Sequence, residues 1–303
     1  MSVMPNESVT ALNVNPDGIY VDGTLGGGGH SEIILKKLKS GMLIGIDRDE
    51  TALAAAASKL KSFENFVPIR GNFHDLPEIL QSQGISAIDG LLLDLGVSSH
   101  QIDTPNRGFS FRFDGPLDMR MDMSARLTAR DIVNNYTEKD LANILYCFGE
   151  ERHSRRIAKA ITKEREEKPI ETTKQLADII EGVCPPRKDR PPPSMRSFMA
   201  LRIAVNNELE PLKAAIENVV PLLKNNGRIA VITFHSLEDR IVKSVFVKLA
   251  DPCECPRDIP YCVCGKKPML RVITKKPITP GQAELEANSR AHSAKLRIAE
   301  RII

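Results

Sequence analysis

Short apolar runs alternate with helix-like runs over the first third of the chain. Between Gly18 and Leu95, the apolar runs at 19–22, 42–47, 66–70 and 88–95 have the length and composition of buried strands. Helical patterns fill the gaps, and Asp49 is placed to cap a helix that contains the alanine-rich run 53–60. This alternation is typical of βαβ units, and it predicts an α/β fold with an open, mostly parallel, Rossmann-like sheet.

The alternation stops after Leu95, and the next strand pattern, at 228–234, comes more than a hundred residues later. The interval contains helical patterns at 129–135, 138–148, 150–165 and 173–182, followed by a proline-rich breaker stretch at 184–194. We therefore expect a mostly helical subdomain at 104–195, inserted into a core formed by 1–103 and 196–303.

The core resumes with a pattern that predicts one helix over 196–223, the strand 228–234 and a helix over 238–249. The segments 270–274 and 294–302 are expected to add the last strands.

Composition changes this picture little. Of 303 residues, 42% are apolar and 27% are charged, as in ordinary soluble globular proteins. No apolar run reaches membrane-spanning length, and the N-terminus does not have the pattern of a secretory signal, so we expect a cytoplasmic protein without a membrane partner.

The net charge of +3 is too small to imply a nucleic-acid partner by itself. Two basic stretches fit either phosphate contacts or a solvated surface. The first contains Arg187, Lys188, Arg190, Arg196 and Arg202, and the second contains Lys266, Lys267, Arg271, Lys275 and Lys276.

The first strand runs into a glycine-rich loop, residues 22–30, with the sequence DGTLGGGGH. Glycines let a backbone approach a ligand closely, and a helix that follows at 32–38 would present free N–H groups. The loop contains no Gly-x-Gly-x-x-Gly triplet, which disfavours a dinucleotide. An acid before Gly26-x-Gly28 instead favours S-adenosylmethionine, whose methionine and sugar need no diphosphate site.

Two further positions fit this cofactor. Asp47 ends the second strand about 20 residues after the loop, where a carboxylate can accept both ribose hydroxyls. Phe73 follows the third strand and is placed to contact the adenine base if the sheet is doubly wound, although a lone aromatic there also fits the core.

The fourth strand delivers Asp94 to the carboxyl edge of the sheet, where substrates bind in such folds. Methyl transfer to an exocyclic amine needs no strong base, but the nitrogen lone pair must point at the methyl group. Asp94 is the candidate catalytic residue, since its carboxylate can accept the amine hydrogens. The alternative is that Asp94 only contacts the cofactor or caps the next segment.

Five motifs in one order make the chain resemble the bacterial RsmH (MraW) family. They are DGTLGGGGH at 22–30, DLGVSS at 94–99, RGFSF at 107–111, GPLDMRMD at 115–122 and TFHSLEDR at 233–240. The resemblance implies an S-adenosylmethionine-dependent methyltransferase with a helical insertion. It also implies the substrate, which is N4 of a cytidine in the decoding (P-site) region of 16S ribosomal RNA in the small ribosomal subunit.

Carried over by position, the family's cofactor contacts fall on seven residues and include no nucleophile. They are Gly28, Gly29, His30, Asp47, Phe73, Asp94 and Gln101. The chain departs from the family at its start, where a usual His is absent and Pro5 stands where an aliphatic residue is common. Either part of the pocket wall is altered or the start codon is misassigned.

The segment 107–113 interleaves guanidinium groups with aromatics, which suits an unstacked base and its phosphates. Phe109 or Phe111 would then stack on the cytosine. The alternative is that this segment packs the insertion against the core. In TFHSLEDR, Ser236 and Asp239 are spaced as a helix N-cap with an acidic first turn. His235 then lines the RNA pocket or, as we favour, makes a structural hydrogen bond.

Cys253-x-Cys255 and Cys262-x-Cys264 leave two interpretations open, a four-thiolate zinc knuckle or reduced free thiols on a surface loop. We assign no metal from the sequence, because the Cys-x-Cys spacing is tighter than usual. The sequence also leaves open monomer or homodimer, and free RNA or assembled subunit as substrate.

Three other functions compete with the leading one. A DNA amino-methyltransferase is disfavoured because Asp94-Leu-Gly-Val replaces the Asp-Pro-Pro-Tyr type of motif, and a nicotinamide oxidoreductase is disfavoured by the missing triplet. A non-enzymatic RNA-binding protein is disfavoured by the intact acidic and glycine positions.

Overall fold

The computed structural model describes residues 2–185, 192–256 and 261–302. The chain forms two compact units: Met1–Gly96 with Leu209–Ile303 make the first unit, and Val97–Glu208 make the second. The predicted insertion at 104–195 lies inside the second unit, which begins seven residues earlier and ends thirteen residues later.

The first unit is built on a mixed sheet. In the described residues, seven strands are ordered β3-β2-β1-β4-β5-β7-β6. The strands are β1 (Ile19–Asp22), β2 (Met42–Asp47), β3 (Phe66–Arg70), β4 (Ile88–Asp94), β5 (Leu223–Thr233), β6 (Leu270–Val272) and β7 (Lys295–Arg301). β1 to β5 are parallel, and β7 pairs antiparallel with β5 and β6. This confirms the predicted α/β sheet.

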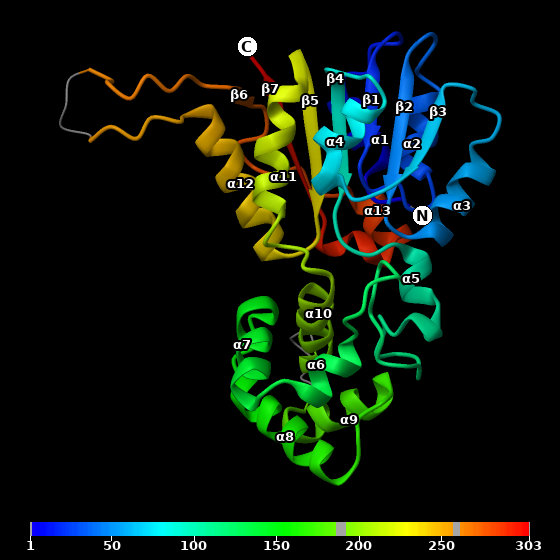
Figure 1. Ribbon diagram of the computed structural model, residues 1–303, viewed down its shortest axis with the longest axis vertical. Coiled ribbons are helices and arrows are strands. Elements are labelled where there is room, and N and C mark those ends of the chain that lie inside the picture. The colour runs from blue at the N-terminus through cyan, green and yellow to red at the C-terminus, as the bar shows by residue number, and fades with distance from the viewer. Residues whose placement is uncertain (1, 186–191, 257–260, 303) are drawn as a thin grey trace. The chain divides into compact units, whose positions relative to one another are not determined.

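Helices cover both faces of this sheet (Figure 1). They are α1 (Pro5–Leu12), α2 (Gly29–Leu35), α3 (Glu50–Lys59), α4 (Leu76–Ser82), α11 (Leu212–Val219), α12 (Ser236–Ala250) and α13 (Gln282–Ala287). Short 3₁₀ turns lie at η1 (Phe73–Asp75), η3 (Val220–Leu222) and η4 (Ser289–Ser293). Asp49 caps α3 as predicted, since its side chain accepts from the N–H of Thr51.

The two faces have separate cores because strand side chains alternate. Leu91 and Leu93 pack with α4, α11 and α12, whereas Leu92 between them packs with α1 and α2. The strands are therefore apolar at nearly every position, which is why their sequence signal is strong.

The second unit is helical and has its own core. It contains α5 (Ser99–Asp103), η2 (Pro105–Arg107), α6 (Ala129–Asn135), α7 (Glu138–Gly149), α8 (Ser154–Glu167), α9 (Thr173–Val183) and α10 (Pro193–Asn206). The core includes Ile132, Leu145, Ile157, Leu176 and Leu201, each at most 1% exposed. This confirms the helical insertion.

Some predicted boundaries were wrong for identifiable reasons. The single helix expected over 196–223 is two helices, because Asn207 adopts a left-handed φ of 46° that ends α10, and Pro211 caps α11. The helix expected from residue 150 begins at Ser154, because Glu150 has a φ of 47° and ends α7. β5 begins five residues earlier than expected.

In the described part of the chain, no helix is long and apolar enough to cross a membrane.

Candidate active site

The glycine-rich loop after β1 is fastened to the ends of both neighbouring strands. The N–H of Leu25 donates to the carbonyl of Ile46 in β2, and the N–H of Gly23 donates to the carbonyl of Leu92 in β4, both at 2.9 Å. Gly28 has a φ of 69°, a conformation that favours glycine, and it is the N-cap residue of α2. A Cβ on Gly27 would meet no atom within 4 Å. The loop is thus held on both sides while its tip stays accessible.

Asp22 holds this loop in place through hydrogen bonds of its carboxylate. It is 1% exposed, its Oδ2 accepts from the Ser31 hydroxyl at 2.7 Å, and its Oδ1 accepts from the N–H of Thr24 at 3.2 Å. Burial raises the pKa of Asp22, while His30 and these two hydrogen bonds oppose the rise. Asp22 therefore joins the end of β1 to the first turn of α2.

Asp47 lies beside the loop at the end of β2. Its Oδ2 accepts from the N–H of Gly26 at 2.8 Å, and its Oδ1 accepts from the N–H of Asp49 at 2.9 Å. Burial raises the pKa of Asp47, and the two N–H groups oppose that rise. A carboxylate oxygen has a second lone pair, so each oxygen can still accept a hydroxyl.

Asp94 lies at the end of β4, on the other side of the loop. Its N–H donates to Thr24 Oγ1 at 2.6 Å, and its Oδ2 lies 3.7 Å from His30 Nδ1. Its Oδ1 is buried and has no hydrogen-bond partner among the described residues. Burial raises the pKa of Asp94 to about 6; His30 opposes this, and Asp22 and Glu238 add to it.

A buried oxygen without a donor costs about 1–3 kcal/mol. Asp94 Oδ1 is therefore an unsatisfied hydrogen-bond acceptor, and it lies beside the glycine loop. Such a site is typical of a functional residue rather than of one selected for stability.

His30 links Asp94 to the N-terminal segment. It is 4% exposed, and its Nε2 lies 2.9 Å from the carbonyl oxygen of Val3, which is itself buried. Val3 thus contacts the end of the loop, in the region where the sequence led us to expect an altered pocket wall.

Phe73 lies in the core on one face of the sheet and is 7% exposed. Its ring packs edge-on against His74, with centroids 4.2 Å apart. Burial, with a smaller effect of Arg48, lowers the pKa of His74 to about 4, so this imidazole is neutral at pH 7. The sequence analysis did not single out His74; its place after β3, at the same edge as Asp47, was the available signal.

The expected cap of α12 was wrong by one residue. His235 is the N-cap, not Ser236: its Nδ1 accepts from the N–H of Glu238 at 3.4 Å, and Glu238 Oε2 accepts from the N–H of Phe234 at 2.8 Å. His235 thus makes the structural hydrogen bond that we favoured. Glu238 is 2% exposed and acts on the pKa of Asp94, and the sequence analysis missed it.

Gln101 lies in the second unit, as the third residue of α5. Its N–H donates to Ser98 Oγ at 3.2 Å and its Oε1 accepts from the N–H of Ser98 at 3.0 Å, which forms a capping box. The other six predicted cofactor residues, Gly28, Gly29, His30, Asp47, Phe73 and Asp94, all belong to the first unit.

The aromatic segment is largely internal to the second unit. Phe109 and Phe111 are partly buried against its core, and the Phe111 ring contacts Phe198 at a centroid distance of 5.7 Å. Arg107 is 8% exposed and donates to the carbonyl of Arg120 at 2.9 Å. Phe113, which is 48% exposed, is the most exposed aromatic side chain of this segment.

The first basic stretch is partly structural. Arg187, Lys188 and Arg190 lie outside the described residues. Arg196 pairs with Glu151 at 2.6 Å, and Arg202 pairs with Glu208 at 2.9 Å, so both bind acids of their own unit.

The second basic stretch is more exposed. Arg271 pairs with Glu300 and Lys266 pairs with Glu254, whereas Lys267, Lys275 and Lys276 are exposed. These three lysines remain available for phosphate contacts.

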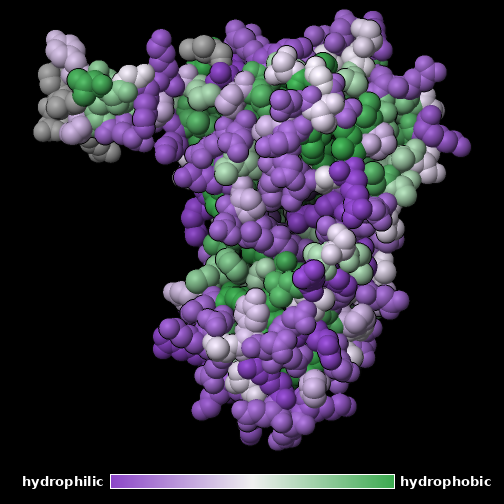
Figure 2. Space-filling model, in the orientation of Figure 1, coloured by the Kyte–Doolittle hydropathy of each residue, from purple (hydrophilic) through white to green (hydrophobic). Residues whose placement is uncertain are grey.

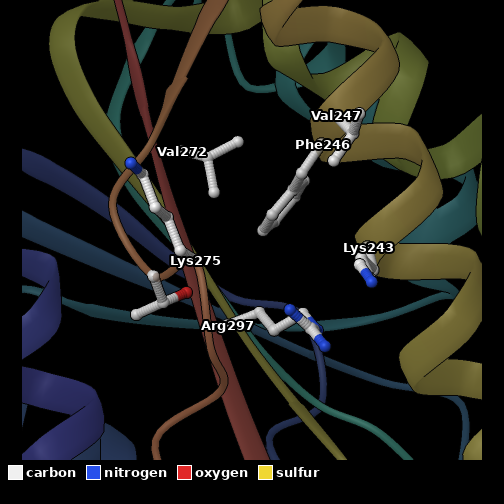
Figure 3. Close-up of a pocket in the computed structure, with 7 residues that line it drawn as sticks. Lys243, Phe246, Val247, Val272, Lys275 and Arg297 are labelled. Carbon is white, nitrogen blue, oxygen red and sulfur yellow. The ribbon is translucent and has the colours of Figure 1, made fainter.

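A small pocket elsewhere in the first unit, of about 200 Å³, lies between α12 and the β6–β7 edge (Figure 3). Its lining residues are Lys243, Phe246, Val247, Val272, Thr274, Lys275 and Arg297. None of them is a predicted site residue, so this pocket is separate from the glycine loop.

The sequence matches the profile of the MraW methylase family over residues 1–302. The chain belongs to this family. Membership confirms the resemblance drawn from the five motifs.

Three relatives have the name ribosomal RNA small subunit methyltransferase H. The protein of Trichlorobacter lovleyi is 54% identical and the alignment covers 100% of this chain and 98% of that protein. That of Caldicellulosiruptor saccharolyticus is 54% identical, with 99% and 98% covered. That of Carboxydothermus hydrogenoformans is 52% identical, with 99% and 97% covered.

Proposed function

We propose that this MraW family member transfers a methyl group from S-adenosylmethionine to the exocyclic N4 of a cytidine in the decoding (P-site) region of 16S ribosomal RNA. The relatives' shared name and their identity over nearly the full length support the small-subunit RNA as substrate. Such a substrate agrees with the cytoplasmic location expected from the sequence.

The residues at the carboxyl edge fit S-adenosylmethionine. The open side of Gly27 allows a ligand to approach the backbone, and Asp47 retains lone pairs for two ribose hydroxyls. We assign cofactor binding to Gly28, Gly29, His30, Asp47, Phe73, Asp94 and Gln101. When bound, the cofactor supplies an electrophilic methyl group on a sulfonium.

Asp94 would orient the substrate amine. Its buried Oδ1 can accept one N–H of the exocyclic amine, which turns the nitrogen lone pair away from the carboxylate and toward the loop. Orientation of this kind is a large part of catalysis when no strong base is needed. Asp94 is thus the proposed catalytic residue.

Two neighbours would keep Asp94 in position. Thr24 Oγ1 accepts from the backbone N–H of Asp94, and His30 Nδ1 lies near Oδ2, so the carboxyl group is fixed on one side and Oδ1 is left for the amine. The unpartnered Oδ1 is the observation on which the proposal depends. For the helical unit we propose substrate recognition, with Phe113 as its exposed aromatic.

The test compares four substrates with labelled S-adenosylmethionine: small ribosomal subunits, naked 16S RNA, the same RNA with the target cytidine replaced by uridine, and duplex DNA. We expect label on N4-methylcytidine at one RNA position, mapped by nuclease digestion and mass spectrometry, and none on the uridine-substituted RNA. The amount of label on the subunits, compared with that on naked RNA, identifies which of the two the enzyme uses as substrate.

Label on DNA alone would establish the competing DNA amino-methyltransferase. Label on a carbon of the base or on a ribose hydroxyl would refute transfer to N4. Binding of RNA with no label on any substrate would favour the non-enzymatic alternative.

A further inference from the structure

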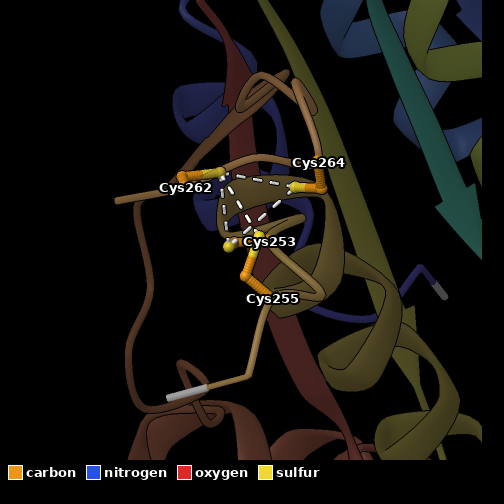
Figure 4. A group of neighbouring side chains, drawn as sticks. All are labelled: Cys253, Cys255, Cys262 and Cys264. Atoms are coloured by element: carbon orange, nitrogen blue, oxygen red, sulfur yellow. Dashed lines mark hydrogen bonds between the residues drawn. The ribbon is translucent and has the colours of Figure 1, made fainter. Parts of the chain in front are cut away.

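Four cysteine sulfur atoms lie close together in the segment between α12 and β6 (Figure 4). The Sγ atom of Cys262 lies 3.6 Å from that of Cys253, 3.8 Å from that of Cys255 and 3.4 Å from that of Cys264. Cys264 Sγ lies 4.0 Å from Cys253 Sγ, and all four sulfurs are within 4.8 Å of one another.

These spacings are those of a tetrahedral thiolate site. With a zinc–sulfur bond of about 2.3 Å, the sulfurs of a regular tetrahedron lie about 3.8 Å apart. The four distances of 3.4–4.0 Å bracket that value. A disulfide would require about 2.05 Å, so no pair of these cysteines is bonded.

The backbone around the sulfurs supports the same interpretation. The N–H of Val263 donates to Cys255 Sγ at 3.3 Å. Hydrogen bonds of this kind stabilise thiolate rather than thiol. Gly265, with a φ of 66°, lets the chain turn directly after Cys264.

The segment has no apolar core that would explain the convergence. Its described residues from Asp251 to Pro268 are exposed or half-buried, and Tyr261 and Val263 are each 81% exposed. Figure 2 shows the segment extending from the body of the first unit with side chains exposed around it. In a segment without a core, a metal ion is the usual means of holding a fixed conformation.

We propose that Cys253, Cys255, Cys262 and Cys264 bind one zinc ion, which has a structural role. Four thiolates fill the coordination shell and leave no position for water or substrate, so this ion would take no part in methyl transfer. The four thiols release their protons to solvent as the ion binds. The inference does not rest on the proposed function, because none of its residues belongs to the methyl-transfer site.

The test uses the full-length chain, expressed without a polyhistidine tag in medium containing zinc. We expect about one zinc per chain by elemental analysis. We also expect cobalt(II) to replace it and to give the visible bands and sulfur-to-cobalt charge-transfer absorption of a tetrahedral thiolate site. The double variant Cys253→Ser/Cys262→Ser should lose both signals, whereas the control Cys147→Ser, at another exposed cysteine, should keep both.

Thiol accessibility gives an independent measurement. A thiol reagent should react quickly with Cys147 in the native protein and, after a strong zinc chelator is added, with the four cysteines of the segment as well. The number of fast-reacting thiols per chain then rises from one to five, while Cys184 stays buried. The chelator should leave this number unchanged in the double variant.

Several results would overturn the proposal. They are five fast-reacting thiols, Cys147 and the four cysteines of the segment, in a protein purified without zinc, disulfides in the freshly purified chain, an iron signal instead of zinc, or zinc that persists in the double variant. If the double variant fails to fold, the metal content and the chelator response of the unmodified chain still decide the question.

Discussion

Two groups of carboxylates in the first unit differ in what surrounds them. Asp22, Asp47 and Asp94 lie at the carboxyl edge, and burial raises their pKa values; Arg48 only partly opposes this rise at Asp47. Glu300 is buried and Asp239 is half-buried, but arginines outweigh the effect of burial and lower their pKa values.

The arginine contacts of the second group are short and specific. Asp239 accepts from Arg297 at 2.5 and 3.1 Å, and Glu300 accepts from Arg228 at 2.9 Å. These pairs join α12 to β7 and β5 to β7. The second group therefore stabilises the fold, whereas burial of the first group carries a net cost, which is typical of functional sites.

The largest expected effect is that of Asp94→Asn, which keeps the shape of the side chain and removes the charge. Turnover should fall by at least about 10²-fold, because a neutral amide is a weaker acceptor for the amine hydrogens than a carboxylate, while cofactor affinity changes less. Single-turnover kinetics and a binding titration separate the two effects, and unchanged turnover would disprove the catalytic role.

The same variant should be more stable than the unmodified chain at pH 7.5. The raised pKa of Asp94 means that its ionised form disfavours the native state, an effect that is complete above about pH 6 and disappears as the pH falls toward the unfolded value. Denaturant unfolding should show a gain of about 1 kcal/mol at pH 7.5 and none near pH 4.

Asp239→Asn should instead make the protein less stable. Loss of the charge leaves Arg297, which is 5% exposed, without its partner, and the free energy of unfolding should drop by about 2–3 kcal/mol. Asp178→Asn is the control, since the Lys174–Asp178 pair is exposed and should contribute less than about 0.5 kcal/mol. Equal effects of the two variants would contradict the division into two groups.

Asp47→Ala should weaken cofactor binding by about 10-fold or more, since it removes an acceptor for ribose and releases the N–H of Gly26. Calorimetry with S-adenosylhomocysteine measures this affinity. Glu50→Ala, at an exposed carboxylate of the next helix, should leave it unchanged. An Asp47→Ala protein with normal affinity would remove Asp47 from the site.

The smallest expected effect is on the pH dependence of kcat/KM. If Asp94 acts as the ionised acceptor, kcat/KM should be half-maximal near pH 6 and fall about 10-fold per unit below it. The Asp94→Asn variant should lack this inflection. An identical inflection in both proteins would assign it to another group.

Much of the sheet could be predicted because buried strands have a strong apolar signal. β1, β2 and β3 have the predicted bounds, and so does α6, whose helix begins after a capping threonine. The position of Asp94 at the edge of the sheet followed from the strand that precedes it.

The parts that failed depend on contacts between distant residues. The link from His30 to Val3 and the position of Glu238 near Asp94 join segments that no local pattern connects. The break between α10 and α11 has a local signal in Asn207 and Pro211, but the apolar periodicity continues through it and predicts one helix.

The connection between β4 and β5 has a consequence for how such an enzyme could arise. α11, which lies in the first unit and packs on the sheet, precedes β5 and completes the crossover between these two parallel strands. The sheet thus keeps a full set of crossover helices without the 112 residues of Val97–Glu208. A gene for a protein of this fold could therefore acquire, exchange or diversify this insertion at one site without losing a strand or a crossover helix of the sheet.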